Sequence, residues 1–505
     1  MASVHIPCPR LGFACPYNGS KTRNIARLRT HVYSKQPKII AEATNVPVVR
    51  RSANYPPSTW SYDYLQSLTN NYVGKKYEIT WHRLKEKVRT MISEDTVVEN
   101  LLATLELFDD LQRLGISYHF KDEINNVLKM IYICYYEAHD KWNTMDLSLK
   151  ALGFRLLRQH GYHIPQVLKD IKDETGNFKA YVREDVVGML NLYEASFLAV
   201  EDENILDEAR EFTSKCLKEM LDIKNIVNQS MSMLISHALE LPLMWRIKRF
   251  EAMWFIEAYK RKSDMRAVLL ELAQLDFNIV QGIHQEDLKY SSRWWEGLCW
   301  NKKLSFARDR LVESFMWAVG ANHEPSYDVL RINVTKSIYL VNVIDDVYDV
   351  YGTLDELEQF TEVVRRWDIN AAEGVPDYMK ICFLGFHNTI NEMAYNTMTN
   401  QDSFVLPYAE LERGDVPKSI QCYMHETGAT EDEARAYVKS LIKEAWKKIN
   451  KERLSVKSPS LQMFLECASN IGRMGQFTYD RGDIFGAPDD LYKSHETALL
   501  FEPKS

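Results

Sequence analysis

Hydrophobic residues recur every three to four positions along most of the chain, with polar and charged residues between them. This spacing places apolar side chains on one face of an α-helix. No alternating runs of strand length stand out, and we find neither a repeat of fixed period nor a low-complexity segment. Helices are predicted over Val97–Leu114, Asp185–Phe197, Ile205–Leu221, Arg246–Tyr259, Met265–Ile283, Phe306–Val319, Val334–Val350 and Glu431–Ile449. We therefore expect a nearly all-helical (all-α) protein.

Composition supports the helical class and suggests two domains. Aromatic residues make up 11% of the 505 residues, whereas Gly (20) and Pro (16) are scarce, which favours long helices around aromatic cores. A charged stretch from Tyr259 to Asp264 separates two helical blocks, so we expect helical domains at 50–262 and 263–505. No run of 18 apolar residues occurs, which argues against a membrane span. The eight cysteines form no C-x-x-C pair, so a zinc module or disulfide framework is not indicated.

Charge separates the first 49 residues from the rest. Residues 1–49 hold seven Lys or Arg side chains against one acid, Glu42, although the whole chain has a net charge of −8. A basic, acid-poor leader is typical of an organelle transit peptide, and in a plant protein the organelle would be the plastid (chloroplast). The alternative is a disordered basic tail. The acidic remainder argues against nucleic acid as a partner.

Three carboxylates gather where the apolar helix that begins near Val334 is expected to end. Asp345 and Asp349 share one helical face at i, i+4, and Asp346 is adjacent. Acids at a helix C-terminus repel one another and oppose the macrodipole, so they need a compensating partner. Oxygen-only ligands suit Mg²⁺ or Mn²⁺ bridging to phosphate oxygens. The alternative is a solvated acidic helix end.

Two arginines and two tryptophans precede this cluster. Arg308 and Arg310 are expected on an amphipathic helix of their own, where they would point in different directions, one towards a diphosphate and the other towards local acids. A surface ion-pair cluster is the alternative for such a pair. The indoles of Trp294 and Trp295 offer faces that attract a carbocation, although core packing is the alternative for one of the two.

Taken together, these elements resemble plant class I terpene synthases of the monoterpene type, subfamily b. The resemblance runs from Arg50 to Ser505, and no Asp-x-Asp-Asp run of the protonation-initiated cyclases occurs. The motifs that carry it are Arg50-Arg51 with Trp60 after eight further residues, Leu111-Gln-Arg-Leu-Gly115, Arg308-Asp-Arg310, Asp345-Asp346-x-x-Asp349 and Arg413-Gly-Asp-Val-Pro-Lys-Ser419.

The resemblance implies a two-domain helical enzyme, with its leader cleaved shortly before Arg50, whose C-terminal bundle ionises a prenyl diphosphate, most simply geranyl diphosphate. It implies a catalytic cluster of Asp345, Asp346 and Asp349 that holds Mg²⁺ or Mn²⁺, with Arg308 and Arg310 binding the diphosphate. It also implies a monomer with an N-terminal strand over the site. Residues with roles implied by the resemblance are Arg50, Arg51 and Trp60 in that strand, and Tyr479 and Asp483 near the pocket mouth.

One element of the family pattern is missing. The family has a second metal-binding helix with oxygen ligands at i, i+4 and i+8, directly before a segment like Arg413–Ser419. Here Glu410 fits the last ligand position and Asp402 the first, but Leu406 stands where a hydroxyl is needed, and Pro407 would break the helix. We therefore expect an internal deletion near 408/409 that leaves Glu410 as the remaining ligand of that motif.

Three interpretations remain open at this point. The first is an active monoterpene synthase, and the second is a catalytically impaired splice or assembly variant of such an enzyme. The third is a helical scaffold or binding protein, which leaves the converging carboxylates unexplained. The product is not readable from the sequence, because pocket shape decides it.

Overall fold

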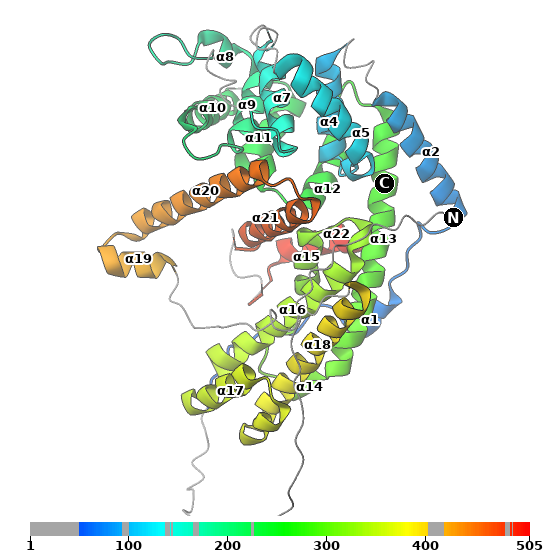
Figure 1. Cartoon of the computed structure of the whole chain (residues 1–505), viewed down its shortest axis with the longest axis vertical. Helices are drawn as coiled ribbons and strands as arrows, with labels where there is room; N and C mark the ends of the chain where they lie inside the picture. The colour runs from blue at the N-terminus through cyan, green and yellow to red at the C-terminus, as the bar shows by residue number, and fades with distance from the viewer. Residues whose placement is uncertain are drawn as a thin grey trace, which may run out of the picture. The chain divides into compact units, whose positions relative to one another are not determined.

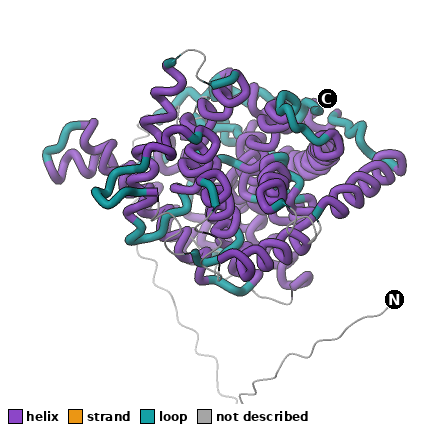
Figure 2. Tube along the Cα trace, turned by 90° about the horizontal axis from the view of Figure 1, so that it is seen from above, coloured by secondary structure: helices purple, strands orange, loops and turns teal. Residues whose placement is uncertain are grey.

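Helices form most of the chain in the computed structural model (Figure 1). The structure describes residues 50–92, 100–136, 142, 145–164, 171–223, 227–401, 419–479, 485, 486 and 488–504. Within these ranges Figure 2 shows helices joined by loops, and β pairing is limited to an isolated bridge between Lys172 and Phe178. The expected all-α class is confirmed. Residues Arg50–Ser505 form one compact unit.

The first helices pack against one another within a hydrophobic core that also includes the later helices. Helices α7 and α9 pack tightly together, and α4 and α10 contact this pair. Their bounds, with the neighbouring helices, are α1 (Tyr62–Ser67), α2 (Lys75–Met91), α4 (Leu101–Arg113), α5 (Lys121–Ile131), α7 (Leu147–Gln159), α8 (Ala180–Glu184), α9 (Val186–Ser196), α10 (Asn204–Asp222), α11 (Gln229–Glu240) and α12 (Lys248–Tyr259).

The later helices include those that carry the predicted site. Helix α13 contacts α1, α2 and α16, while α15 packs against α16 and α21. The bounds are α13 (Ala267–Leu298), α14 (Trp300–Lys303), α15 (Leu311–Ala321), α16 (Asp328–Asp346), α17 (Leu354–Arg366), α18 (Asp377–Gln401), α19 (Ser419–Thr427), α20 (Glu431–Ser455), α21 (Pro459–Tyr479) and α22 (Asp490–Leu500). The short 3-10 and π turns are Ser117–Phe120, Tyr132–Tyr136, Leu243–Trp245, Pro325–Tyr327, Val347–Tyr351 and Ile369–Gly374.

Local sequence explains several helix ends. The Asn100 side chain caps α4 by accepting from the Ala103 amide, and Thr353 forms a capping box with Glu356 at the start of α17. Gly115 follows α4 with a φ of +76°, and an added Cβ would lie 2.7 Å from the Ala252 Cβ. This turn therefore requires glycine.

Several predicted helices differ in length from the observed ones: α16 begins at Asp328 rather than near Val334, and α20 continues to Ser455 rather than ending at Ile449. Helix α13 continues to Leu298 rather than ending near Ile283, because its far half still buries one face. Helix α15 begins at Leu311 rather than at Phe306, so the arginine motif lies in the preceding loop. In the described part of the chain, no helix is long and apolar enough to cross a membrane.

Candidate functional site

The acidic motif lies where α16 changes its helical form. The α-helix ends at Asp346, and the chain continues as a π-helical turn over Val347–Tyr351. A π-helix bonds residue i to i+5, so Asp349 does not follow the ideal i, i+4 spacing. Asp346 is completely buried, the Asp345 side chain is 31% exposed, and Asp349 is exposed. The three aspartates therefore have three different environments.

Arg308 holds the first two aspartates. Its backbone N–H and its Nε donate to the two carboxylate oxygens of Asp346 at 2.7 and 2.9 Å. Its Nη2 donates to Asp345 Oδ2 at 3.0 Å. The prediction that Arg308 lies on a helix is wrong: it lies in the loop before α15, where its backbone N–H binds a side-chain carboxylate instead of a helical carbonyl.

Charge explains this arrangement. Burial alone would lower the pKa of the Arg308 guanidinium, but the hydrogen bond and negative charge of Asp346 raise it overall. The guanidinium thus offsets the two adjacent carboxylates. Among the described residues, no group of three or more His, Cys, Asp and Glu side chains lies close enough together to hold a metal ion. Hard divalent cations nonetheless fit an all-carboxylate donor set such as Asp345 with Asp349.

Arg310 contacts backbone rather than solvent. It is 1% exposed and donates to the carbonyl oxygens of Phe485 at 2.9 Å, Pro56 at 3.1 Å and Gly486 at 3.2 Å. Carbonyls from the N-terminal segment and from the loop before α22 therefore meet at one guanidinium. Arg308 and Arg310, only two residues apart, face different parts of the molecule.

The two neighbouring tryptophans also differ. Trp295 is 6% exposed, and its indole N–H lies 2.9 Å from Asp309 Oδ1 and 3.0 Å from the Tyr339 hydroxyl. Trp294 is half-buried, donates to the Thr389 hydroxyl at 3.2 Å and forms a T-shaped pair with Tyr339, with ring centroids 5.8 Å apart. Trp295 thus belongs to the core next to the arginine loop, the segment Phe306–Arg310 before α15, whereas Trp294 joins α13 to α18.

Residues 50–60 extend over this region without forming a strand, since the described residues offer them no sheet partner. Arg50 forms a double hydrogen bond with Glu356 at 2.7 and 2.8 Å, and its guanidinium lies 4.7 and 4.9 Å from the ring centres of Tyr351 and Tyr378. Its hydrogen bond holds the pKa of Glu356 at about 2. Trp60 donates to Glu496 at 3.1 Å. Side chains, rather than backbone pairing, hold this segment.

The remaining predicted residues lie elsewhere or outside the described residues. Arg51 is exposed, and Tyr479 is 56% exposed, with its ring 6.5 Å from that of Trp317. Glu410, Asp483 and the junction near 408/409 lie outside the described residues.

Three contributing residues were not found from the sequence. Glu356 is detectable in principle, because Thr353 and Glu356 form the capping-box pattern at a helix start. The ring of Tyr55 lies 5.2 Å from the Arg308 guanidinium, and the Tyr378 hydroxyl donates to Glu356 at 2.9 Å. Neither tyrosine has a local pattern that signals these distant contacts.

Fold and site together define the class of this protein as an all-helical enzyme whose acidic helix end and arginine loop suit metal-assisted chemistry on phosphate groups. The comparisons with known proteins identify the family. Residues 59–239 match the terpene synthase N-terminal domain, residues 296–411 the terpene synthase metal binding domain, and residues 408–448 the C-terminal metal binding domain of terpene synthase family 2. The chain belongs to the terpene synthase family and is an enzyme of that family.

Curated relatives are plant monoterpene synthases. The chain is 45% identical to R-linalool synthase QH1, a chloroplastic protein of Artemisia annua, in an alignment of 565 positions that covers 94% of this chain and 98% of the relative. It is 42% identical to chloroplastic myrcene synthase of Quercus ilex, in an alignment of 549 positions that covers 91% of each. These alignments span both predicted helical domains.

Solved structures give the same assignment. Limonene synthase with 2-fluorolinalyl diphosphate superposes with a TM-score of 0.84 at 36% identity, covering 90% of this chain and all of that one. Isoprene synthase from grey poplar (Populus x canescens), in complex with three Mg²⁺ ions and dimethylallyl-S-thiolodiphosphate, gives a TM-score of 0.79 at 36% identity, covering 89% and 99%. The metal binding domain supports a divalent metal cofactor for this chain.

Proposed function

We propose that this chain is built to convert geranyl diphosphate to a monoterpene, in the manner that the names of its linalool, myrcene and limonene synthase relatives indicate. The observation that carries the proposal is the Arg308 guanidinium seated between Asp345 and Asp346 at the end of α16. A cation and carboxylates side by side supply both a direct contact for diphosphate and ligands for a metal.

We assign a role to each residue of this site. Asp345 and Asp349 would hold Mg²⁺, or Mn²⁺ in its place, which as a Lewis acid withdraws charge from the diphosphate. Asp346, buried against Arg308, positions the guanidinium, and Arg308 binds the diphosphate as the allylic bond breaks. The half-buried Trp294 supplies an aromatic face for the cation.

We propose that the N-terminal segment excludes water from this chemistry. Arg50 anchors it at the start of α17, the Pro56 carbonyl accepts from Arg310, and Trp60 anchors it at α22. A covered site keeps the reactive cation away from solvent. We also propose that the enzyme acts as a monomer, since residues 50–60 reach the site of their own chain and no second copy is needed to cover it.

We propose that the basic leader directs the protein to plastids. Its seven-to-one excess of basic side chains supports this location, as does the chloroplastic location named for its relatives.

A second candidate is an impaired variant that lacks one wall of the site. The alignments with the linalool and myrcene synthases include about 475 and about 460 residues of this chain. In each alignment, about 90 positions are therefore filled by the relative and are gaps in this chain. Large apolar side chains are also exposed on three helices around the predicted junction. On α18 they are Tyr395 (63%) and Met398 (41%), on α20 Leu441 (47%) and Ile442 (43%), and on α21 Leu461 (54%) and Phe464 (67%).

These exposed faces support a deletion near 408/409. Helices of a globular bundle normally bury such faces against a neighbour. Helices occupying the roughly 90 unmatched positions would supply that neighbour and, with it, the second set of metal ligands. A chain without them would keep its diphosphate contacts but turn over slowly, because a misplacement of about 1 Å can cost on the order of a hundredfold in rate.

The test is to incubate the purified protein with geranyl diphosphate and Mg²⁺ or Mn²⁺ and to identify volatiles by gas chromatography. A matched variant carries a relative's missing segment inserted between Tyr408 and Ala409. Metal-dependent monoterpene release that rises by orders of magnitude in the insertion variant supports both proposals. Full activity without the insertion would refute the impaired-variant proposal, and no product from either protein would refute the assigned reaction.

A further inference from the structure

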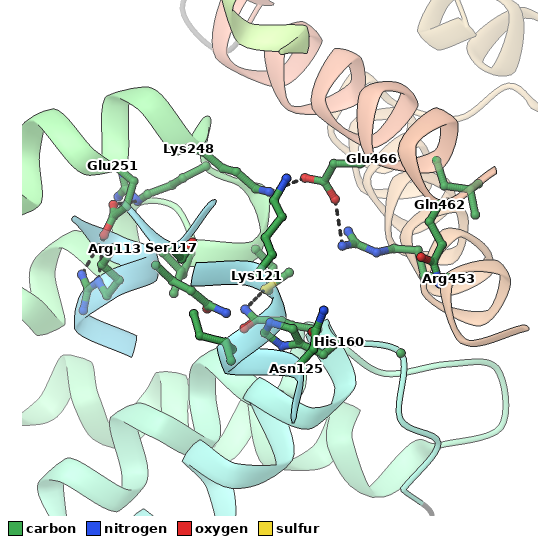
Figure 3. Close-up of a pocket in the computed structure, with 18 of the residues that line it drawn as sticks. Arg113, Ser117, Lys121, Asn125, His160, Lys248, Glu251, Arg453, Gln462 and Glu466 are labelled. Atoms are coloured by element: carbon green, nitrogen blue, oxygen red, sulfur yellow. Dashed lines mark hydrogen bonds and ion pairs between the residues drawn. The ribbon is translucent and has the colours of Figure 1, made fainter. Parts of the chain in front are cut away.

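A polar cavity lies apart from the site described above. It has a volume of about 510 Å³, and none of its lining residues belongs to that site. Figure 3 shows Arg113, Lys121 and His160 from the N-terminal helices on one side, and Arg453 and Glu466 from α20 and α21 on the other. The cavity therefore lies where the C-terminal helices meet the N-terminal ones.

Cations outnumber carboxylates around this cavity. Three of them share the single carboxylate of Glu466: Lys248 Nζ at 2.6 Å, Arg453 Nη2 at 2.8 Å and Arg473 Nη1 at 3.6 Å. Figure 3 shows Lys248 and Arg453 each contacting a different oxygen of Glu466. The full set of charged lining residues is Arg113, Lys121, Arg246, Lys248, Arg453 and Arg473 against Glu251, Glu324 and Glu466.

The electrostatics of the cluster agree with an excess of positive charge. Burial lowers the pKa of Arg473 to about 10, so its charge is costly where it lies. Burial alone would raise the pKa of Glu466, yet Lys248, Arg453 and Arg473 together hold it well below its usual range. One carboxylate cannot neutralise three cations. Solvent screens Lys248, which is 52% exposed, but Arg473 is 3% exposed, and its other partners, the Met244 carbonyl and the Asn470 side chain, carry no charge.

We propose that this cavity binds a small phosphorylated anion. A phosphate group offers several oxygens to guanidinium forks and an ammonium at once, which a single carboxylate cannot. A water molecule takes about 30 Å³ of liquid volume, and a phosphate group is only a few times larger. The cavity of about 510 Å³ therefore has room for a phosphate group together with an organic part of the ligand. Lys248 on α12 and Arg453 on α20 would bind it together, so the ligand would tie the C-terminal helices to the N-terminal ones.

Calorimetric titration of the whole chain with inorganic phosphate tests this site, with glucose 6-phosphate as a second probe for an organic phosphate. EDTA and matched chloride exclude metal-dependent and purely ionic effects. We expect saturable binding that weakens by roughly tenfold in Arg453→Gln and in Lys248→Gln, since each loses one charge-assisted hydrogen bond. Arg435→Gln removes an exposed cation paired with Glu431 on the same α20 and should bind like the parent.

Arg308→Gln distinguishes this cavity from the site of the proposed function. It should keep its affinity for phosphate, whereas loss of phosphate binding in this variant would place the ligand at the arginine loop and overturn the proposal. Equal heats with phosphate and chloride would also overturn it. Unchanged phosphate affinity in folded Arg453→Gln and Lys248→Gln proteins, checked by far-UV circular dichroism, would show that these cations serve packing alone.

Discussion

Asp346 and Asp345 are neighbours in the same motif, but their contacts predict different effects of the same substitution. Asp346 is completely buried and receives the backbone N–H and the Nε of Arg308, with Nη2 also at 2.8 Å, whereas Asp345 is partly exposed and receives Nη2 at 3.0 Å. We expect Asp346→Asn to reduce the stability of the fold. Asp345→Asn should instead weaken metal-dependent binding of a prenyl diphosphate, with little effect on stability.

The expected loss of stability in each variant follows from the burial of the aspartate and from the contacts that Arg308 keeps. Breaking a buried ion pair costs about 3–5 kcal/mol when the remaining charge has no other partner. In Asp346→Asn, Arg308 keeps Asp345 at 3.0 Å, and the new amide oxygen still accepts one hydrogen bond. We therefore expect a loss of about 2–3 kcal/mol in the free energy of unfolding. For Asp345→Asn, whose side chain is 31% exposed, solvent screening limits the loss to about 0.5–1 kcal/mol.

Urea unfolding of both variants, followed by tryptophan fluorescence and far-UV circular dichroism, measures this difference. Calorimetric titration with Mg²⁺ and a non-hydrolysable prenyl diphosphate measures the binding effect. The reasoning would be refuted if both variants lost the same stability, or if Asp345→Asn bound the analogue as tightly as the parent. A fully stable Asp346→Asn protein would show that Arg308 does not depend on that carboxylate.

Three further predictions concern residues 50–60, which cover the site, and the basic leader at residues 1–49. Arg50→Gln should lower the free energy of unfolding by about 1 kcal/mol at pH 7, measured by thermal unfolding. Because the pKa of Glu356 in the folded protein is depressed to about 2, this loss of stability should fade as pH falls from about 4.5 towards 2. A loss that does not change with pH would contradict this explanation. Burial and the nearby Glu313 raise the pKa of Glu496, so this carboxyl stays protonated in the folded protein at pH values where it is ionised in the unfolded chain. The free energy of unfolding should therefore fall as pH rises above the ordinary glutamate range. Glu496→Gln should therefore raise the unfolding temperature at pH 8 but not at pH 4, and equal shifts at both pH values would exclude this cause. A fluorescent fusion of residues 1–49 should enter leaf plastids, and a cytosolic signal would reject the leader assignment.

The fold class was predictable because helical periodicity is a local property of the sequence. Helix α9, predicted over Asp185–Phe197, is observed over Val186–Ser196, and its cap comes from Asp185 directly before it. The start of α15 was not predictable in the same way. The chain at Phe306–Arg310 has a helical pattern, but the carboxylate of Asp346, 38 residues later in sequence, binds the Arg308 backbone N–H. A tertiary contact thus overrides local preference.

The burial and the distant partners of the site residues could not be predicted from local sequence either. Spacing grouped Asp345, Asp346 and Asp349 because they are close in sequence, but it carried no information on burial. The structure shows one of them enclosed by Arg308 and another exposed on a π-helical turn. The Arg50–Glu356 pair spans 306 residues of sequence, so no local pattern joins its partners.

We propose that a deletion at the predicted junction, near 408/409, would leave half of the site in place. In the described part of the chain, the contacts that hold the Arg308 loop and residues 50–60 come from residues before 379 or after 484. These contacts also join elements that pack directly on one another, such as α15 with α16. The proposed loss of an intervening segment would therefore leave the diphosphate contacts in place, while the exposed faces of α18, α20 and α21 would lack the neighbour that buries them. Binding and turnover should then separate, since Arg308, Asp345 and Asp349 would still bind the diphosphate and its metal, whereas turnover needs ligands on both sides of the diphosphate.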